Sequence, residues 1–152
     1  MLDIAATAAT EVAERLIENA LEDGVSAFDG LGREICRVNA KKSADPARAV
    51  RMSFQSLDGA RHNLTELFGL DLAAGLGAEE WKAAVRGFQK RHLLSHKMGV
   101  VDDEYVRKSG DAHAVVGRKV SIGAEEVREL LRLVGRLGRR VSEKLQEPEK
   151  KP

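Results

Sequence analysis

The chain of 152 residues contains one cysteine, three prolines and few aromatic side chains. The single cysteine, Cys36, excludes a disulfide within the chain and a zinc site built from several cysteines. It fits a reducing compartment, and we expect it to be a small core residue. Aromatic residues make up 4% of the chain, which disfavours a platform that stacks the bases of long single strands.

A strong net charge and a long apolar run are also missing. Lys and Arg number 25 against 24 Asp and Glu, so the net charge is +1 and any polyanion must meet a local basic patch. No apolar run approaches the roughly 20 residues of a membrane span, and the first residues lack the basic region of a secretory signal. We therefore expect a cytoplasmic protein that does not bind membranes.

The composition is that of an ordinary folded domain. Hydrophobic residues make up 43% of the chain and charged residues 32%, which is enough apolar surface for one core. We expect residues 1–147 to form a single helical domain. Residues 148–152, with the sequence PEKKP, are expected to be a disordered charged tail, because they cannot bury enough apolar area to offset their ordering entropy.

Apolar residues recur at helical spacing in several stretches. Over residues 17–38 they step alternately by four and three, which predicts one long helix, bent near Gly24. Asp45 followed by Pro46 predicts the start of a second helix, because aspartate caps helices and proline suits their first turn. Gly69 predicts the end of that helix.

The same pattern continues in the second half of the chain. A third helix is expected over residues 78–99, and a short one after Asp102 that stops by Gly110. Residues 111–123 have no helical period, which predicts an extended loop or a short strand pair. The last helix is expected over residues 124–147. The sequence therefore predicts an all-α fold, a helical bundle of four major helices plus one short helix.

Three polar residues lie near the end of the third expected helix. His92 and His96 are four residues apart, so their side chains share one helix face and continue its apolar stripe. Arg91 lies roughly 140° from His96 around a straight helix, so both reach one atom only if the helix distorts, the arginine wraps around it or a second subunit contributes. The guanidinium requires an anion, either the acidic residues 102–104 or a phosphate.

The segment RHLLSH, residues 91–96, resembles the R-polar-x(3)-H form of the Arg-x(4–6)-His signature of the HEPN superfamily. Members of this superfamily are helical domains that act widely as metal-independent ribonucleases, including toxins and antiphage effectors. Arg91 and His96 match the two invariant motif positions. His92 stands at the polar position, which is often Asn or Asp in the family. The expected order of helices is also similar, over about residues 8–145.

The resemblance implies a metal-independent endoribonuclease of toxin or antiphage-defence type that needs no cofactor. In the family two protomers pair so that their motifs face each other, which implies a homodimer with one composite cleft. One His96 would accept the proton of the ribose 2′-hydroxyl and its twin would protonate the 5′-oxygen, leaving a 2′,3′-cyclic phosphate. Arg91 would stabilise the charge on the phosphorane, and His92 would orient the substrate.

Partners and substrate contacts follow from the same resemblance. The implied partners are a second copy of the chain, an RNA substrate and a nucleotidyltransferase-type antitoxin. Basic residues outside the motif supply candidate substrate contacts, although each of them also fits an ordinary solvated charge. These residues are Lys97, Arg118 and Lys119.

Other interpretations of the motif remain open. The same residues fit a non-catalytic HEPN-like module that dimerises or binds a nucleotide or RNA for regulation. His92 and His96 also fit ordinary core histidines, or a stripe that has simply reached the surface. They also fit two ligands of a metal ion, although a neighbouring arginine opposes a cation and no third ligand is evident. The remaining histidines, His62 and His113, share no motif and receive no role.

Overall fold

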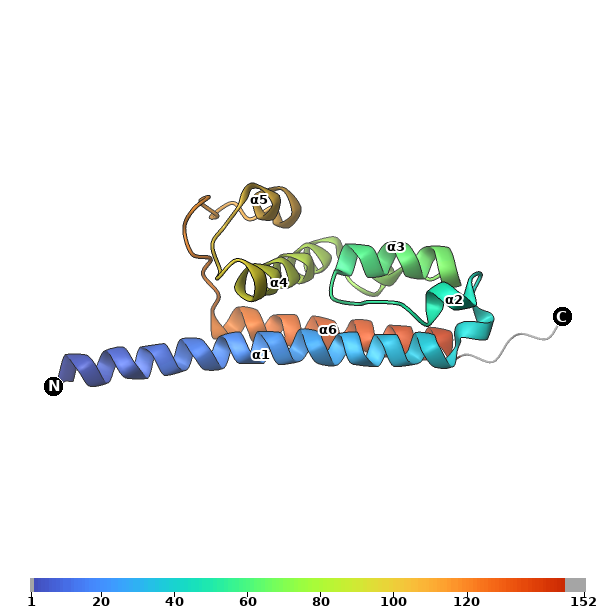
Figure 1. Cartoon of the computed structure of the whole chain (residues 1–152), viewed down its shortest axis with the longest axis horizontal. Helices are drawn as coiled ribbons and strands as arrows, with labels where there is room; N and C mark the ends of the chain where they lie inside the picture. The colour runs from blue at the N-terminus through green and yellow to red at the C-terminus, as the bar shows by residue number, and fades with distance from the viewer. Residues whose placement is uncertain (1, 147–152) are drawn as a thin grey trace.

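The computed structural model describes residues 2–146, and Figure 1 shows that helices dominate this part of the chain. The predicted all-α class is confirmed, because no strand occurs within the described residues. The expected tail, residues 148–152, and the last residue of the expected final helix, Glu147, lie outside them. None of the described helices is both long and apolar enough to cross a membrane.

Two long helices run side by side in the same direction and form one layer of the fold (Figure 1). They are α1 (Leu2–Val38) and α6 (Ala124–Leu145). The second layer contains α3 (Leu57–Phe68) and α4 (Ala78–His96), which lie above this pair. The N-terminal part of α1 projects beyond the other helices.

The core lies between these two layers. On α1 it includes Leu21, Phe28 and Cys36, all 3% exposed or less. Gly24 was expected to bend α1, but the helix continues through it, and a Cβ atom there would overlap Leu131 of α6. Gly24 therefore allows the two parallel helices to approach closely. Leu31, an expected stripe residue, is instead 48% exposed.

The second expected helix is divided in two. The short α2 (Pro46–Ala49) begins where predicted, and the Asp45 carboxylate accepts the N–H of Arg48, but the helix ends after one turn. A new helix, α3, begins after Ser56, whose hydroxyl accepts a backbone N–H at 3.2 Å. It ends at Gly69, which has a φ of 64° as the sequence predicted.

Residues 50–56 connect α2 and α3, and the prediction of one continuous helix was wrong there. Phe54 is fully buried in this connection, and its backbone N–H donates to Asp29 Oδ1 of α1 at 2.7 Å. Val50, which the periodic pattern placed on the buried face, is 53% exposed. The tertiary contact with Asp29 satisfies the backbone of the connection, so the local helical pattern is overridden.

The C-terminal half follows the predicted boundaries closely. α4 begins at Ala78, and the short α5 (Asp103–Ser109) is capped by the Asp102 carboxylate, which accepts the N–H of Tyr105 at 2.8 Å. Gly110 ends α5 with a φ of 62°. Residues 111–123 form an extended segment without a named strand; a single antiparallel bridge joins Val100 to Lys119.

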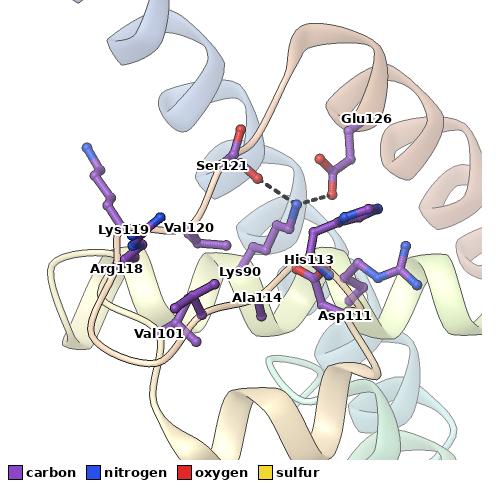
Figure 2. A pocket seen from close by; sticks show the side chains of 12 residues that line it. Lys90, Val101, Asp111, His113, Ala114, Arg118, Lys119, Val120, Ser121 and Glu126 are labelled. Atoms are coloured by element: carbon purple, nitrogen blue, oxygen red, sulfur yellow. Dashed lines mark hydrogen bonds and ion pairs between the residues drawn. The ribbon is translucent and has the colours of Figure 1, made fainter.

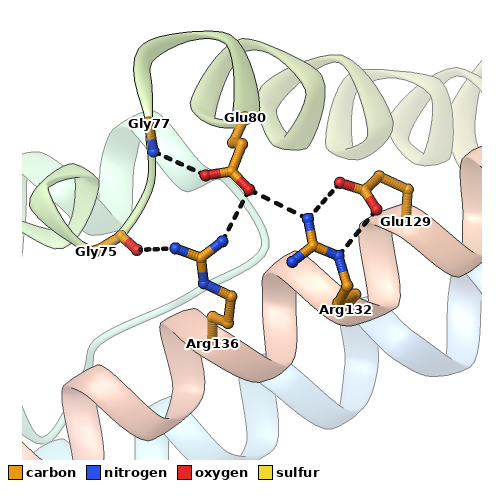
Figure 3. A network of polar contacts seen from close by, with 6 residues as sticks. All are labelled: Gly75, Gly77, Glu80, Glu129, Arg132 and Arg136. Carbon is orange, nitrogen blue, oxygen red and sulfur yellow. Dashed lines mark hydrogen bonds and ion pairs between the residues drawn. The ribbon is translucent and has the colours of Figure 1, made fainter.

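A group of charged residues fixes the start of α4 on α6 (Figure 3). Glu80 accepts the backbone N–H of Gly77 at 3.0 Å, and its other oxygen accepts hydrogen bonds from Arg132 at 3.1 Å and Arg136 at 2.8 Å. These contacts, led by the one from Gly77, hold the pKa of Glu80 below its ordinary value. The network sets the orientation of α4, and therefore the direction in which its final turns point.

Candidate functional site

Arg91 and Glu22 join α4 to α1. Arg91 Nε donates to Glu22 Oε2 at 2.8 Å, and Arg91 Nη2 donates to Glu22 Oε1 at 2.9 Å. Ser95, one turn further along α4, donates its hydroxyl to Glu22 Oε2 at 3.1 Å. The arginine side chain is 11% exposed, whereas that of Glu22 is 43% exposed. The predicted requirement for an anion is thus met within the chain, by a residue that sequence reasoning missed.

The two hydrogen bonds between Arg91 and Glu22 shift the pKa of both groups. The hydrogen bond from Arg91 is the main cause that lowers the pKa of Glu22, and the hydrogen bond to Glu22 in turn raises the pKa of Arg91. Both groups therefore stay charged at neutral pH. Nη1 of Arg91 makes no hydrogen bond within residues 2–146, so one edge of the guanidinium is available to a second acceptor.

His92 and His96 lie together on the surface of α4. Their ring centroids are 4.8 Å apart and the ring planes are inclined by 48°. Both side chains are exposed, so the interpretation of them as core histidines was wrong. The buried face of α4 passes instead through Phe88 and Leu93, because the 3.6-residue period rotates the stripe away from His92. The two imidazoles are open to solvent and to a ligand.

Arg91 and His96 point in different directions, as their spacing predicted. Arg91 contacts α1, while His96 lies at the exposed C-terminal end of α4. The acidic residues 102–104 are not the partner of Arg91. Glu104 is ion-paired with Lys108 at 2.6 Å, which chiefly lowers its pKa. One chain by itself therefore presents the pair of imidazoles and leaves the arginine beside Glu22.

The candidate substrate contacts are divided between two regions. Lys97 is exposed at the C-cap of α4, one residue beyond His96. Arg118 and Lys119 lie in the extended segment, and both line a cavity that is separate from the histidine pair. Lys119 Nζ is 3.5 Å from Glu18 of α1. The structure therefore does not bring these three basic residues together.

The cavity beside Arg118 lies between α4, the extended segment and α6 (Figure 2). Lys90 occupies its centre: Nζ donates to the carbonyl of Ser121 at 2.6 Å and is 2.7 Å from Glu126 Oε1. The Lys90 side chain is only 8% exposed. Sequence reasoning gave Lys90 no role. Lys90 lies roughly 160° from Phe88 around the helix, so the apolar stripe gave no signal that it would be buried.

The structure also shows where the other two histidines lie and whether further metal ligands surround the histidine pair. His62 is exposed on α3, with Nε2 3.2 Å from Glu66 one turn away, while His113 lines the cavity. Within the described residues, no group of three or more His, Cys, Asp or Glu side chains is arranged to hold a metal ion. His92 and His96 therefore lack the further ligands that a zinc site requires.

Comparisons with family models, curated proteins and solved structures find no match to this chain. The likeness to HEPN domains accordingly rests on the Arg91–His96 segment and on the order of the helices.

Proposed function

We propose that this chain is a metal-independent endoribonuclease of toxin or antiphage-defence type, active as a homodimer. The observation that carries the proposal is the solvent-exposed pair of imidazoles, His92 and His96, with a guanidinium on the same helix. Histidine exchanges protons near neutral pH, and cleavage of RNA by its own 2′-hydroxyl needs only a base, an acid and charge stabilisation. Accessible imidazoles are suited to that chemistry.

His96 is assigned the proton transfers. One copy removes the proton of the 2′-hydroxyl, and the partner's copy donates a proton to the departing 5′-oxygen. The phosphorus–5′-oxygen bond breaks as the 2′-oxygen–phosphorus bond forms, which gives a 2′,3′-cyclic phosphate and a 5′-hydroxyl. His92, whose ring lies 4.8 Å from that of His96, orients the phosphate.

Arg91 stabilises the phosphorane through its free edge. Glu22 holds Nε and Nη2, which leaves Nη1 for a phosphate oxygen. The carboxylate also fixes the direction of the guanidinium, so Glu22 is a positioning residue.

The direct test is incubation of purified protein with total RNA in EDTA. Wild-type protein is expected to cleave RNA and to leave cyclic phosphate ends, whereas Arg91→Ala and His96→Ala should each lose at least about 100-fold in rate. His62→Ala is the matched control, because this histidine is also exposed on a helix and lies elsewhere. Equal cleavage by wild type and His96→Ala, or none by wild type, rejects the proposal.

A second function is favoured by the Arg91–Glu22 contact itself. In a non-catalytic dimerisation or RNA-binding regulatory module, Arg91, Glu22 and Ser95 simply join α4 to α1. The two functions differ in what Arg91→Ala changes. If the chain is such a module, Arg91→Ala should have a lower thermal midpoint than the wild type, and neither protein should have nuclease activity. The nuclease predicts toxicity on expression that disappears in both Arg91→Ala and His96→Ala, although His96→Ala leaves the thermal midpoint unchanged.

A further inference from the structure

The cavity between α4, the extended segment and α6 has the size of a small-molecule site. Its volume is about 490 Å³, within the range of roughly 300–1,000 Å³ that is typical of ligand pockets. One part of its wall is apolar and includes Val101, Ala114 and Val120. Charged side chains form much of the remainder, and Figure 2 shows Glu126 and Asp111 beside Lys90, with Arg118 and Lys119 further away. A ligand here would meet both kinds of surface.

The two carboxylates of the cavity already have partners. Glu126 is ion-paired with Lys90 at 2.7 Å. Asp111 Oδ2 accepts the hydroxyl of Tyr105 at 2.7 Å, and Oδ1 accepts the backbone N–H of His113 at 3.0 Å. Burial by itself would raise the pKa of Asp111, but these hydrogen bonds and the nearby cations bring it below its ordinary value. Those cations are Lys90 and Arg86, so Asp111 offsets part of the positive charge of the cavity.

Two arginines of the cavity form no ion pair within the described residues, although the charge of Asp111 acts on Arg86 and Arg118 is exposed to solvent. Arg86 Nε is buried without a hydrogen-bond acceptor, and within residues 2–146 its guanidinium forms no ion pair. Arg118 likewise has no side-chain acceptor in the described part of the chain. A buried N–H of a charged group that lacks an acceptor destabilises the fold. The cavity is lined by four Lys or Arg side chains and two carboxylates, so it attracts an anion, and the forked guanidinium geometry matches phosphate oxygens.

We infer that this cavity binds a phosphate monoester carried by a nucleoside. Arg86 and Arg118, which both line the cavity, hold the phosphate. The apolar side formed by Val101 and Val120 contacts the nucleoside. The volume is large enough for a free mononucleotide or for the phosphorylated end of an RNA.

The site is distinct from the histidine pair. Lys90 and His92 are two residues apart on α4, which separates their directions by roughly 160° around the helix. The cavity also lies next to α6, whereas His92 and His96 are exposed to solvent. Nucleotide binding here therefore does not depend on the proposed nuclease activity.

Isothermal titration calorimetry tests the inference with adenosine monophosphate, adenosine and inorganic phosphate. We expect adenosine monophosphate to bind with a dissociation constant below about 1 mM, and adenosine to bind at least tenfold more weakly. Arg86→Gln and Arg118→Gln should each weaken nucleotide binding at least tenfold. Arg107→Gln is the matched control, because this arginine is exposed on α5 and does not line the cavity.

The outcomes separate the sources of the phosphate. A short RNA with a 5′-phosphate that binds as tightly as the nucleotide identifies an RNA end, and binding of the free nucleotide alone identifies a metabolite. Equal binding of adenosine and its monophosphate overturns the inference. So does unchanged affinity in Arg86→Gln and Arg118→Gln, or an absence of binding by wild type. Thermal midpoints show whether each variant is folded. If Arg86→Gln does not fold, Arg118→Gln still tests the inference.

Discussion

The interpretation of the motif on α4 depends on the contacts of Glu22. It binds two nitrogens of Arg91 and the hydroxyl of Ser95, and so it links α1 to the turn of α4 that carries the histidines. Both the catalytic and the structural interpretation of Arg91 pass through this contact. A substitution at Glu22 keeps the guanidinium of Arg91 in the protein. It therefore separates the positioning of Arg91 from its contribution to stability more cleanly than the removal of Arg91 does.

Glu22→Gln is expected to lower the free energy of unfolding at pH 7 by about 1 kcal/mol, since the pair is partly exposed. Arg91 lowers the pKa of Glu22 in the folded state. The contribution of the carboxylate is therefore present above its unfolded pKa, near 4.3, and is lost as the pH falls through the lower folded value. Thermal melts of both proteins from pH 7 to pH 3 should converge at the acidic end; a constant difference contradicts this account.

Cys36 should be chemically inert in the folded protein. It is 0% exposed, and burial raises the pKa of its thiol to about 12, so almost no reactive thiolate is present near neutral pH. Iodoacetamide at pH 8 is expected to leave the native protein unmodified and to label it fully in denaturant, as measured by intact mass. Rapid labelling of the native protein would show that the core around Cys36 opens readily.

At the scale of elements, glycines set the distance between α1 and its neighbours. A Cβ atom on Gly32 would lie 2.6 Å from Cδ2 of Phe54, in the connection between α2 and α3. The ring of Phe54 cannot move aside, because it is fully buried and lies edge-to-face with Phe28 at 5.5 Å. Gly30, two residues earlier on the same helix, has no atom within 4 Å of such a Cβ.

The substitutions Gly30→Ala and Gly32→Ala form a matched pair. Gly30→Ala should raise the free energy of unfolding by about 0.5–1 kcal/mol, because alanine favours the helix more than glycine does. Gly32→Ala has the same local advantage but should lower the free energy of unfolding by about 1–3 kcal/mol through the clash with Phe54. Urea titrations measure both. Stabilisation by both substitutions would mean that the connection is loosely packed.

At the scale of the whole molecule, the N-terminal part of α1 leaves apolar side chains exposed. The side chains of residues 6–16 are exposed, including Val12 at 59% and Leu16 at 63%. Figure 1 shows this part of the helix extending beyond the two layers. In the proposed homodimer this exposed apolar surface could be buried in the interface. The homodimer would also bring a second histidine pair to the site.

Mixing experiments test whether the nuclease site is composite. Excess His96→Ala, added to a fixed amount of wild-type protein under conditions of subunit exchange, is expected to reduce cleavage several-fold, because a mixed dimer contains only one His96. Excess His62→Ala should not reduce cleavage. Activity that depends only on the amount of wild-type protein, whatever the excess of His96→Ala, would place the whole site in one chain.

Local chemistry in the sequence determined most of the helical boundaries. Asp45, Asp102, Gly69 and Gly110 cap or end helices where they were predicted to do so, because a cap depends on residues within a few positions of itself. The short distance between the rings of His92 and His96 follows equally directly from a spacing of four on a helix, whereas their exposure does not. These features need no knowledge of the remainder of the chain.

Only the tertiary structure decided the features that join residues far apart in the chain. The helical period of residues 46–68 gave way to the contact between Phe54 and Asp29, and Arg91 found its anion in Glu22 on α1. The cavity around Lys90 likewise depends on how α4, the extended segment and α6 meet. Periodicity and caps are set by neighbours along the chain, whereas ion pairs and cavities depend on which surfaces the packing brings together.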